Sequence, residues 1–149
     1  IKQGLQPKVQ FHEYLNMPEY NNIQTRMLGG NSFPYRNYTV TKSTFDAAVE
    51  AIENLFFVGI KEAYDISVQL MLRELQVNHS VTLRRERDNS KLAKAKADIL
   101  QNATTVSLIK EHNYWDIKLY RVAIKRFCLT AQKYPDLYAQ LFSTSVKCP

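Results

Sequence analysis

The sequence predicts a helix-rich α/β fold, and three observations support this expectation. Apolar residues recur at helical spacing on both sides of a short apolar run, in residues 43–56 and 61–75. The run between them, Phe56–Ile60, is aromatic and aliphatic and too short for a helix, so we expect a buried strand of a parallel sheet. Helix, strand and helix in immediate succession are typical of α/β domains. The last third of the chain again has a helical pattern.

The first helix is expected to begin at Ser43–Asp46, where hydroxyl residues precede an acidic residue of the first turn. Gly59 is expected to allow close backbone approach near the end of the strand. The second helix follows over about residues 61–75, with Glu62 and Asp65 in its first turn. The expected core-facing residues are Phe45, Ala48, Val49, Ile52 and Phe56 in the first helix, and Tyr64, Val68, Met71, Leu72 and Leu75 in the second.

The second half of the chain is expected to begin with a polar, charged loop over residues 76–90. A helix over about residues 91–100 follows, and a break near His112–Asn113 precedes a strong helix. Pro135 is expected to start a final short helix. The residues expected on one face of the strong helix are Asp116, Leu119, Tyr120, Ala123 and Phe127. Asp116 is expected as the N-cap or first-turn acid of this helix, or as the partner of a buried arginine.

The chain is expected to divide into an N-terminal arm and one domain. Residues 1–42 form the irregular arm, with a helical turn at 23–28 that ends at the Gly29–Gly30 pair. Residues 43–149 form the domain, and the 149-residue chain with 45% hydrophobic residues is large enough for a core. One strand cannot form a parallel sheet alone, and the chain begins at Ile1 without a methionine. We therefore expect a part of a larger domain, with apolar surface that needs a partner.

The formal net charge of +6 is concentrated in one stretch. Residues 84–98 hold six basic and three acidic residues and so supply +3 of it. Two interpretations remain open, a solvated basic surface and an anion-binding loop followed by a helix start. Nucleic acid is not expected as the partner, because no aromatic residues are interleaved in the stretch and no recognition motif is present.

The cysteines and histidines do not suggest a metal site. Cys128 and Cys148 form either one disulfide or two unrelated thiols. The three histidines are scattered, so no zinc-binding pattern is present and no metal is expected. The longest apolar run has six residues, far below the roughly 20 that span a bilayer, so no transmembrane segment is expected.

Three Asn-x-Ser/Thr triplets are candidate glycosylation sites, at Asn37, Asn78 and Asn102. Three such triplets favour a lumenal location in the secretory pathway. The usual catalytic patterns are missing from the sequence: a Walker-type phosphate loop, Gly-x-Ser-x-Gly and His-Glu-x-x-His. The residues alone therefore indicate an α/β domain with an anion-friendly loop, and we assign no catalytic residue.

Three segments resemble conserved stretches of Golgi carbohydrate sulfotransferases, the family that includes the heparan sulfate uronosyl 2-O-sulfotransferases. The resemblance covers roughly residues 22–127, with the three pieces in the family's order. The segments are Asn-Ile-Gln-Thr-Arg-Met-Leu-Gly-Gly at 22–30, Phe-Phe-Val-Gly-Ile-Lys-Glu at 56–62 and Asn-Tyr-Trp-Asp-Ile-Lys-Leu-Tyr at 113–120.

The resemblance implies the C-terminal portion of a fold similar to the P-loop kinases, with a parallel sheet that is incomplete in this chain. It implies sulfuryl transfer from 3′-phosphoadenosine-5′-phosphosulfate to a hydroxyl of a glycan-like acceptor in the Golgi lumen. In the family, the two phosphate-binding elements and the catalytic base lie upstream of the segment at 22–30, and this sequence contains no match to them. We therefore expect the chain alone to be inactive and to need the N-terminal half of the fold or a partner chain.

Four residues are donor-binding candidates by resemblance: Arg84, Arg85, Ser90 and Lys91. They occupy the place of a basic loop that closes over the nucleotide in the family, and guanidinium groups and an N-cap serine suit phosphate oxygens. The loop departs from the family pattern at Glu86 and Asp88, where relatives tend to have threonine. The alternative is a solvated loop.

Gln24 and Arg26 are the substrate-binding candidates, with a buried polar tie as the alternative. Trp115 and Tyr120 could line a sugar site, but at helical spacing they are more often core residues. A second hypothesis for the whole chain is a non-catalytic structural or interaction subunit of a larger assembly, derived from a sulfotransferase. The absent donor loop and the incomplete sheet support this alternative.

Overall fold

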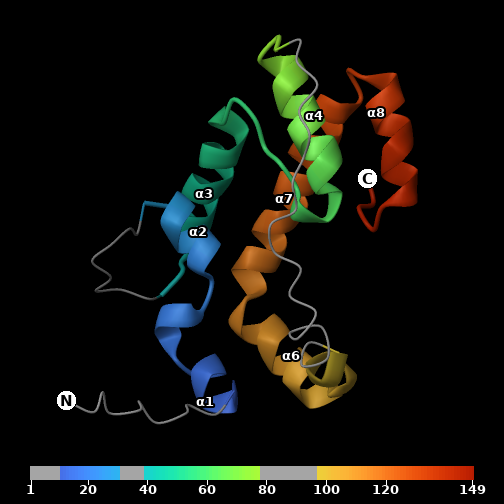
Figure 1. Cartoon of the computed structure of the whole chain (residues 1–149). Coiled ribbons are helices and arrows are strands. Elements are labelled where there is room, and N and C mark those ends of the chain that lie inside the picture. Colours follow the sequence, from blue (N-terminus) through green and yellow to red (C-terminus); the bar gives the residue numbers. More distant parts are fainter. Residues whose placement is uncertain (1–10, 31–38, 78–96) are drawn as a thin grey trace, which may run out of the picture.

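The computed structural model describes residues 11–30, 39–77 and 97–149, and every regular element in these ranges is helical (Figure 1). The helix-rich expectation is therefore confirmed. The α-helices are α1 (Phe11–Leu15), α2 (Ile23–Leu28), α3 (Lys42–Asn54), α4 (Tyr64–Glu74), α6 (Ala103–His112), α7 (Tyr114–Ala131) and α8 (Pro135–Gln140). Short 3-10 helices cover Pro18–Tyr20, Lys61–Ala63 and Leu141–Ser143, and residues 97–101 form a further helical turn.

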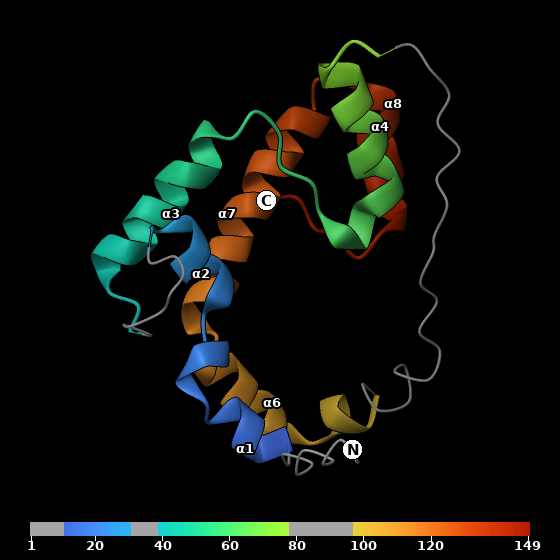
Figure 2. The same ribbon diagram turned by 60° about the vertical axis from the view of Figure 1, so that its left-hand side comes forward.

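Helix α7 is the central element of the molecule. In Figures 1 and 2 it has α2 and α3 along one side and α4 and α8 along the other. It takes part in two apolar clusters. Leu119 packs with Ala48 and Ile52 of α3, whereas Phe127 and the last turns of α7 pack with α4, α8 and the C-terminal segment. A single helix therefore joins the two cores.

Helix α3 begins near the expected position, one residue before Ser43. Its N-cap is Thr41, whose hydroxyl accepts a hydrogen bond from the N–H of Thr44 at 3.2 Å. Ala48 and Ile52 are buried, as the helical spacing predicts. The prediction for Phe56 is wrong: it is 61% exposed, because α3 ends at Asn54 and the chain turns away from the helical path.

The segment expected to be a strand, residues 56–60, is neither helical nor part of a sheet among the described residues, and it is called the extended segment below after the conformation of its last residue. Ile60 has extended dihedrals, with φ −116° and ψ 125°. The Ser67 hydroxyl of α4 accepts from the Ile60 N–H at 2.9 Å and donates to the Ile60 carbonyl at 3.0 Å. A side chain thus satisfies backbone groups that a neighbouring strand would otherwise bind. No described residue supplies a ladder partner, so the expected strand is absent from the part of the chain that the structure describes.

Gly59 confirms the expected close approach of this segment to α4. A Cβ atom at Gly59 would lie 3.3 Å from the Ser67 Cβ and 3.3 Å from the Phe57 ring. The absence of a side chain therefore lets the segment pack directly on the helix.

Helix α4 buries a different face from the one predicted. Its buried residues are Ile66 and Leu70, which pack in the cluster formed with α7 and α8, and Ser67, whose hydroxyl binds Ile60. Of the predicted face, Tyr64, Met71 and Leu75 are 46%, 36% and 51% exposed, whereas Val68 and Leu72 are half-buried. The face assignment is wrong here because the helix is apolar on two sides, and the described core covers only one of them.

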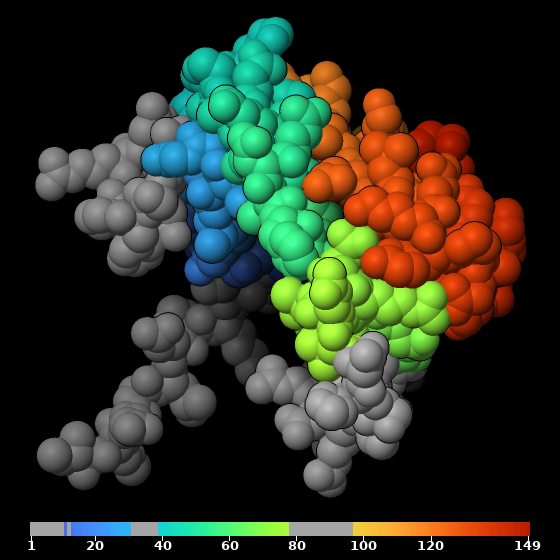
Figure 3. Space-filling model, turned by 90° about the horizontal axis from the view of Figure 1, so that it is seen from above, coloured from blue at the N-terminus to red at the C-terminus, as the bar shows by residue number. Residues whose placement is uncertain are grey.

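A disulfide and an ion pair hold the C-terminal part of the chain against α7 and α4. Cys128 and Cys148 form a disulfide with a Cα–Cα distance of 5.7 Å, which settles the alternatives left open by the sequence. The Arg73 guanidinium of α4 donates two hydrogen bonds to the Asp136 carboxylate of α8. Seen from above, the ends of α3 and α4 lie beside the C-terminal half of α7 (Figure 3).

The remaining expectations are met in part. Residues 11–30, expected to be irregular apart from one turn, contain α1, a 3-10 helix and α2, and α2 ends before Gly29 as predicted. The helix expected over 91–100 is helical at 97–101, and residues 91–96 lie outside the described part. Among the described residues, none of the helices has the length and apolarity needed to cross a bilayer.

Candidate functional site

Among the described residues, the junction between α2 and α7 contains the densest set of side-chain hydrogen bonds between distant segments. Asp116, in the first turn of α7, accepts from the N–H of Thr25 at 2.7 Å and from its hydroxyl at 2.6 Å. Its second oxygen accepts from the N–H of Gln24 at 3.1 Å. Gln24 and Thr25 are the second and third residues of α2. Asp116 therefore caps a helix other than its own.

Asn22 performs the reverse capping. Its Oδ1 accepts from the N–H groups of Trp115 at 2.8 Å and Asp116 at 3.1 Å, the second and third residues of α7. Its Nδ2 donates to the His112 carbonyl at 2.9 Å. Asn22 has left-handed dihedrals, φ 49° and ψ 42°, which asparagine tolerates better than most residues.

The two helices therefore cap each other. The N–H groups used in these bonds are occupied by side chains of the chain itself, so they do not offer an anion site. The junction holds α2 against α7 by polar contacts, in addition to the apolar packing of α3 on α7. Its role in this structure is to fix the geometry of the scaffold.

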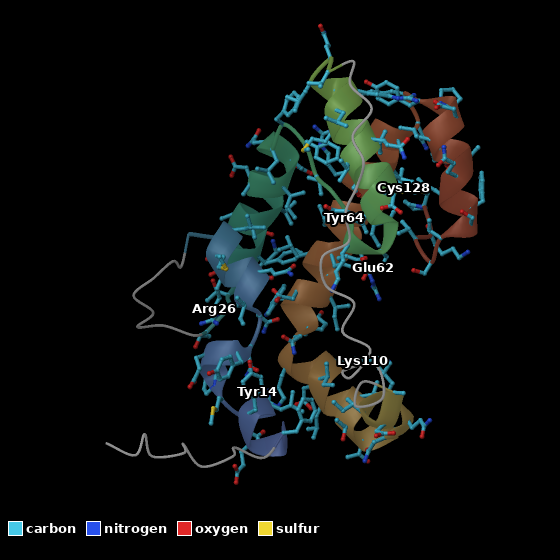
Figure 4. The ribbon with its side chains drawn as sticks, viewed as in Figure 1. Tyr14, Arg26, Glu62, Tyr64, Lys110 and Cys128 are labelled. Atoms are coloured by element: carbon cyan, nitrogen blue, oxygen red, sulfur yellow. A yellow bond between two sulfur atoms is a disulfide. The ribbon has the colours of Figure 1, made fainter. Side chains whose placement is uncertain are left out.

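The two substrate-binding candidates both lie on α2 but differ in exposure. Arg26 is only 2% exposed, and its guanidinium donates to the Glu19 carbonyl, which is the arrangement of a buried polar tie. Figure 4 shows Arg26 on α2. The Gln24 side chain is exposed, and its backbone N–H binds Asp116. Of the two, only Gln24 presents its side chain to solvent.

A second polar contact joins the segment before α4 to α7. The Tyr120 hydroxyl donates to the Glu62 carboxylate at 2.6 Å. Burial, together with the hydrogen bond to Glu62 and its negative charge, raises the pKa of Tyr120 to about 12. Figure 4 labels Glu62 and Tyr64 at the start of α4. Tyr120 packs against the larger apolar cluster, so it has the core position that its spacing favoured.

Trp115 lies in an aromatic cluster between α3 and α7. Its ring is 5.0 Å from that of Phe45 and 5.2 Å from that of Tyr114, measured between centroids. The Lys118 ammonium lies 4.3 Å from the Tyr114 centroid and 5.3 Å from that of Trp115. Trp115 is half-buried and packs on α3, while Tyr114 is 48% exposed.

An open, mainly apolar groove lies between the extended segment and α4. Its volume is about 400 Å³, and Lys61 is the one charged residue among its described lining residues. No group of three or more potential metal ligands occurs among the described residues. The groove has the character of a packing surface and lacks the convergent polar groups of a catalytic site. It is lined by Phe57, Gly59, Ile60, Lys61, Tyr64, Ser67, Val68 and Met71.

Several candidates lie outside the described residues. These are the donor-binding candidates Arg84, Arg85, Ser90 and Lys91 and the glycosylation candidates Asn37 and Asn78. Asn102 is described, and it is the exposed N-cap residue of α6.

The sequence did not predict the mutual capping or the contact between Glu62 and Tyr120. Asp116 was expected as the N-cap or first-turn acid of its helix, or as the partner of a buried arginine. It lies in the first turn of α7, and its bonds reach residues about 90 positions away. Local capping rules consider only the residues beside a helix end, so they cannot identify a cap supplied from elsewhere. No protein-family model, no curated protein and no solved structure matches this chain.

Proposed function

We propose that this chain is the C-terminal scaffold of a sulfotransferase that uses 3′-phosphoadenosine-5′-phosphosulfate and a glycan-like acceptor. One observation supports this proposal most. The three segments that resemble the family are far apart in sequence, and residues of the resembling motifs hold them together. Asp116 binds Gln24 and Thr25, and Tyr120 binds Glu62. A resemblance by chance would not require the matching residues to contact one another.

The reaction proposed is an in-line transfer. The acceptor oxygen bonds to the sulfur, the bond from sulfur to the phosphate oxygen of the donor breaks, and a base takes the acceptor proton. Basic residues stabilise the charge that develops on the leaving nucleotide. In this proposal the base and the main phosphate-binding elements belong to the rest of the enzyme. Arg84, Arg85, Ser90 and Lys91 are this chain's contribution to the nucleotide site.

The extended segment supports the proposal that the rest of the fold binds here. No hydrogen bond joins the backbone of residues 56–59 to another described residue. The side chains beside it are apolar and open, with Leu55 44% and Met71 36% exposed. A β-strand laid along residues 56–59 would pair these backbone groups and cover the groove. We therefore propose that the N-terminal half of the fold, or a partner chain, supplies this strand.

The alternative is a non-catalytic structural subunit that retains the scaffold of a sulfotransferase ancestor. The same open apolar face favours it, since a subunit of a larger assembly also needs a docking surface. The two proposals differ in one respect. Only the enzyme requires the nucleotide to bind.

Calorimetry with 3′-phosphoadenosine-5′-phosphate on the native protein that contains residues 1–149 tests the enzyme proposal. We expect binding, weakened about tenfold or more by Arg84→Ala or Arg85→Ala, because a charge-assisted hydrogen bond contributes about 1.5 kcal/mol or more. Arg121→Ala is the matched control, since Arg121 is an exposed arginine on α7, and it should leave the affinity unchanged.

Sulfuryl transfer to a panel of glycan acceptors, followed with a labelled donor, completes the test. Transfer that depends on the nucleotide-binding arginines would support the enzyme proposal. Absence of both nucleotide binding and transfer in the native protein would remove it and leave the structural subunit. Binding that persists unchanged in both arginine variants would refute the assignment of the loop.

A further inference from the structure

Asn102 occupies a position where a glycan and the fold can coexist. It begins the Asn-Ala-Thr triplet and is the N-cap residue of α6, with extended dihedrals of φ −86° and ψ 101°. The side chains of Asn102, Ala103 and Thr104 are all exposed. Leu100, two residues earlier, is 58% exposed, so the surroundings are open on this side of the chain as well.

The two polar atoms of the Asn102 amide have different roles, one in capping α6 and one in glycan attachment. Oδ1 accepts a hydrogen bond from the N–H of Thr105 at 3.0 Å, which caps the helix. No described residue makes a hydrogen bond to Nδ2. N-linked glycans are attached through Nδ2, and the substituted amide keeps its carbonyl oxygen. The cap on α6 can therefore remain when a sugar is attached.

The disulfide indicates the compartment independently of the triplet. Cys128 and Cys148 are bonded, and the chain has no other cysteine. Disulfides form and persist in oxidising compartments such as the endoplasmic reticulum lumen. The same compartment holds the machinery that glycosylates Asn-x-Ser/Thr triplets.

We infer that Asn102 is an N-glycosylated residue. The donor is a lipid-linked oligosaccharide pyrophosphate. A bond forms between Nδ2 and the anomeric carbon of the sugar, and the bond from that carbon to the pyrophosphate oxygen breaks. The amide loses one proton, and the lipid pyrophosphate leaves with the electron pair. This inference does not depend on sulfuryl transfer.

The location of the glycan leaves the proposed docking face open. Helix α6 lies at the end of the molecule away from α4 and α8 in both ribbon views (Figures 1 and 2). A sugar at the start of α6 therefore does not cover the groove beside α4.

The test is site-specific mass spectrometry on the native protein from a eukaryotic secretory cell. Glycan release by peptide N-glycosidase in heavy-oxygen water converts an occupied Asn102 to labelled aspartate. Two variants remove the acceptor but keep an oxygen that can cap α6. These are Thr104→Ala, which leaves Asn102 intact, and Asn102→Asp, since aspartate is also a good N-cap residue. A variant with both Asn37→Gln and Asn78→Gln isolates the third triplet.

We expect labelled aspartate at position 102 in the wild type. We also expect a gel shift on glycan release in the Asn37→Gln, Asn78→Gln protein, lost when Thr104→Ala is added. Unmodified asparagine at 102 in the mature protein would overturn the inference. So would a protein that stays in the cytosol. A second measurement, mass spectrometry without reduction, should find Cys128 linked to Cys148, and two free thiols would remove the argument for the compartment.

Discussion

Replacing Asp116 by alanine should lower the free energy of unfolding by about 2–4 kcal/mol. The carboxylate accepts three hydrogen bonds, and two of the donors belong to Thr25, which is 0% exposed. After the substitution, the buried N–H and hydroxyl of Thr25 have no acceptor. Each unsatisfied buried donor costs about 1–3 kcal/mol. Gln24 is exposed, so its N–H would bind water instead. Partial relaxation around the two buried donors keeps the loss below the sum of two full penalties.

Urea unfolding followed by helical circular dichroism measures this effect. The midpoint should fall while the slope stays constant, because the same surface is exposed on unfolding. Asp116→Asn keeps one carbonyl oxygen and should lose about half as much stability. Asp46→Ala is the matched control. Asp46 lies in the first half of α3 and forms an exposed ion pair with Lys42, so its loss should cost at most about 0.5 kcal/mol.

The reasoning fails if Asp116→Ala and Asp46→Ala have the same effect. A double-mutant cycle gives a second check, with Asn22→Gly as the partner variant. Glycine removes the other capping side chain but accepts the left-handed dihedrals of position 22. The two substitutions open one shared junction, so the loss in the double variant should be smaller than the sum of the single losses.

Three further predictions concern the other contacts. Burial and the hydrogen bond to Glu62 raise the pKa of Tyr120 to about 12, so the stability linked to its protonated hydroxyl is present below pH 10 and lost as the pH rises to about 12. Tyr120→Phe should remove this part of the pH profile measured by unfolding. Arg73 lowers the pKa of Asp136, so Asp136→Asn should destabilise the protein near neutrality, and the difference from the wild type should vanish as the pH falls below the ordinary value of 3.8. Cys148→Ser should lower the free energy of unfolding by about 3 kcal/mol, given a separation of 20 residues between the cysteines, and a reducing agent should affect the wild type but not this variant.

Local sequence rules predicted the helices well where their signals are local. Gly29 ends α2 as expected, and a Cβ there would lie 2.2 Å from the Thr44 carbonyl oxygen, so the glycine is also required by the contact with α3. Pro135 begins α8 as expected. These features depend on one or two neighbouring residues, which is why they can be recognised without a structure.

The site contacts were not predictable in the same way. Asn22 and Asp116 each bind residues more than 90 positions away in the sequence. In addition, an asparagine just before a helix is ordinarily interpreted as the cap of that helix. The disulfide remained one of two alternatives, because two cysteines 20 residues apart can pair only if the chain folds back between them. Here α8 provides that return, and only the structure shows it.

The wrong face of α4 is the most informative of the differences. Tyr64, Val68, Met71 and Leu75 follow one another at helical spacing, so the pattern correctly identified an apolar face. A second apolar set, which includes Leu70, occupies the opposite face and packs in the described core. Helical spacing of apolar residues shows that a helix face is apolar, but it does not show which of two apolar faces packs in the core.

An eleven-residue helix with two apolar faces normally lies between two layers of a protein. The described residues supply only one of these layers, through α7 and α8. On the other side lie the groove and the extended segment, in which Ser67 satisfies Ile60 while residues 56–59 have no described backbone partner. A second layer that includes a β-strand would cover the open apolar face of α4 and pair the backbone groups of residues 56–59. The proposed second layer is argued from burial and hydrogen bonding among the described residues, so the proposal applies equally to the enzyme and to the structural subunit.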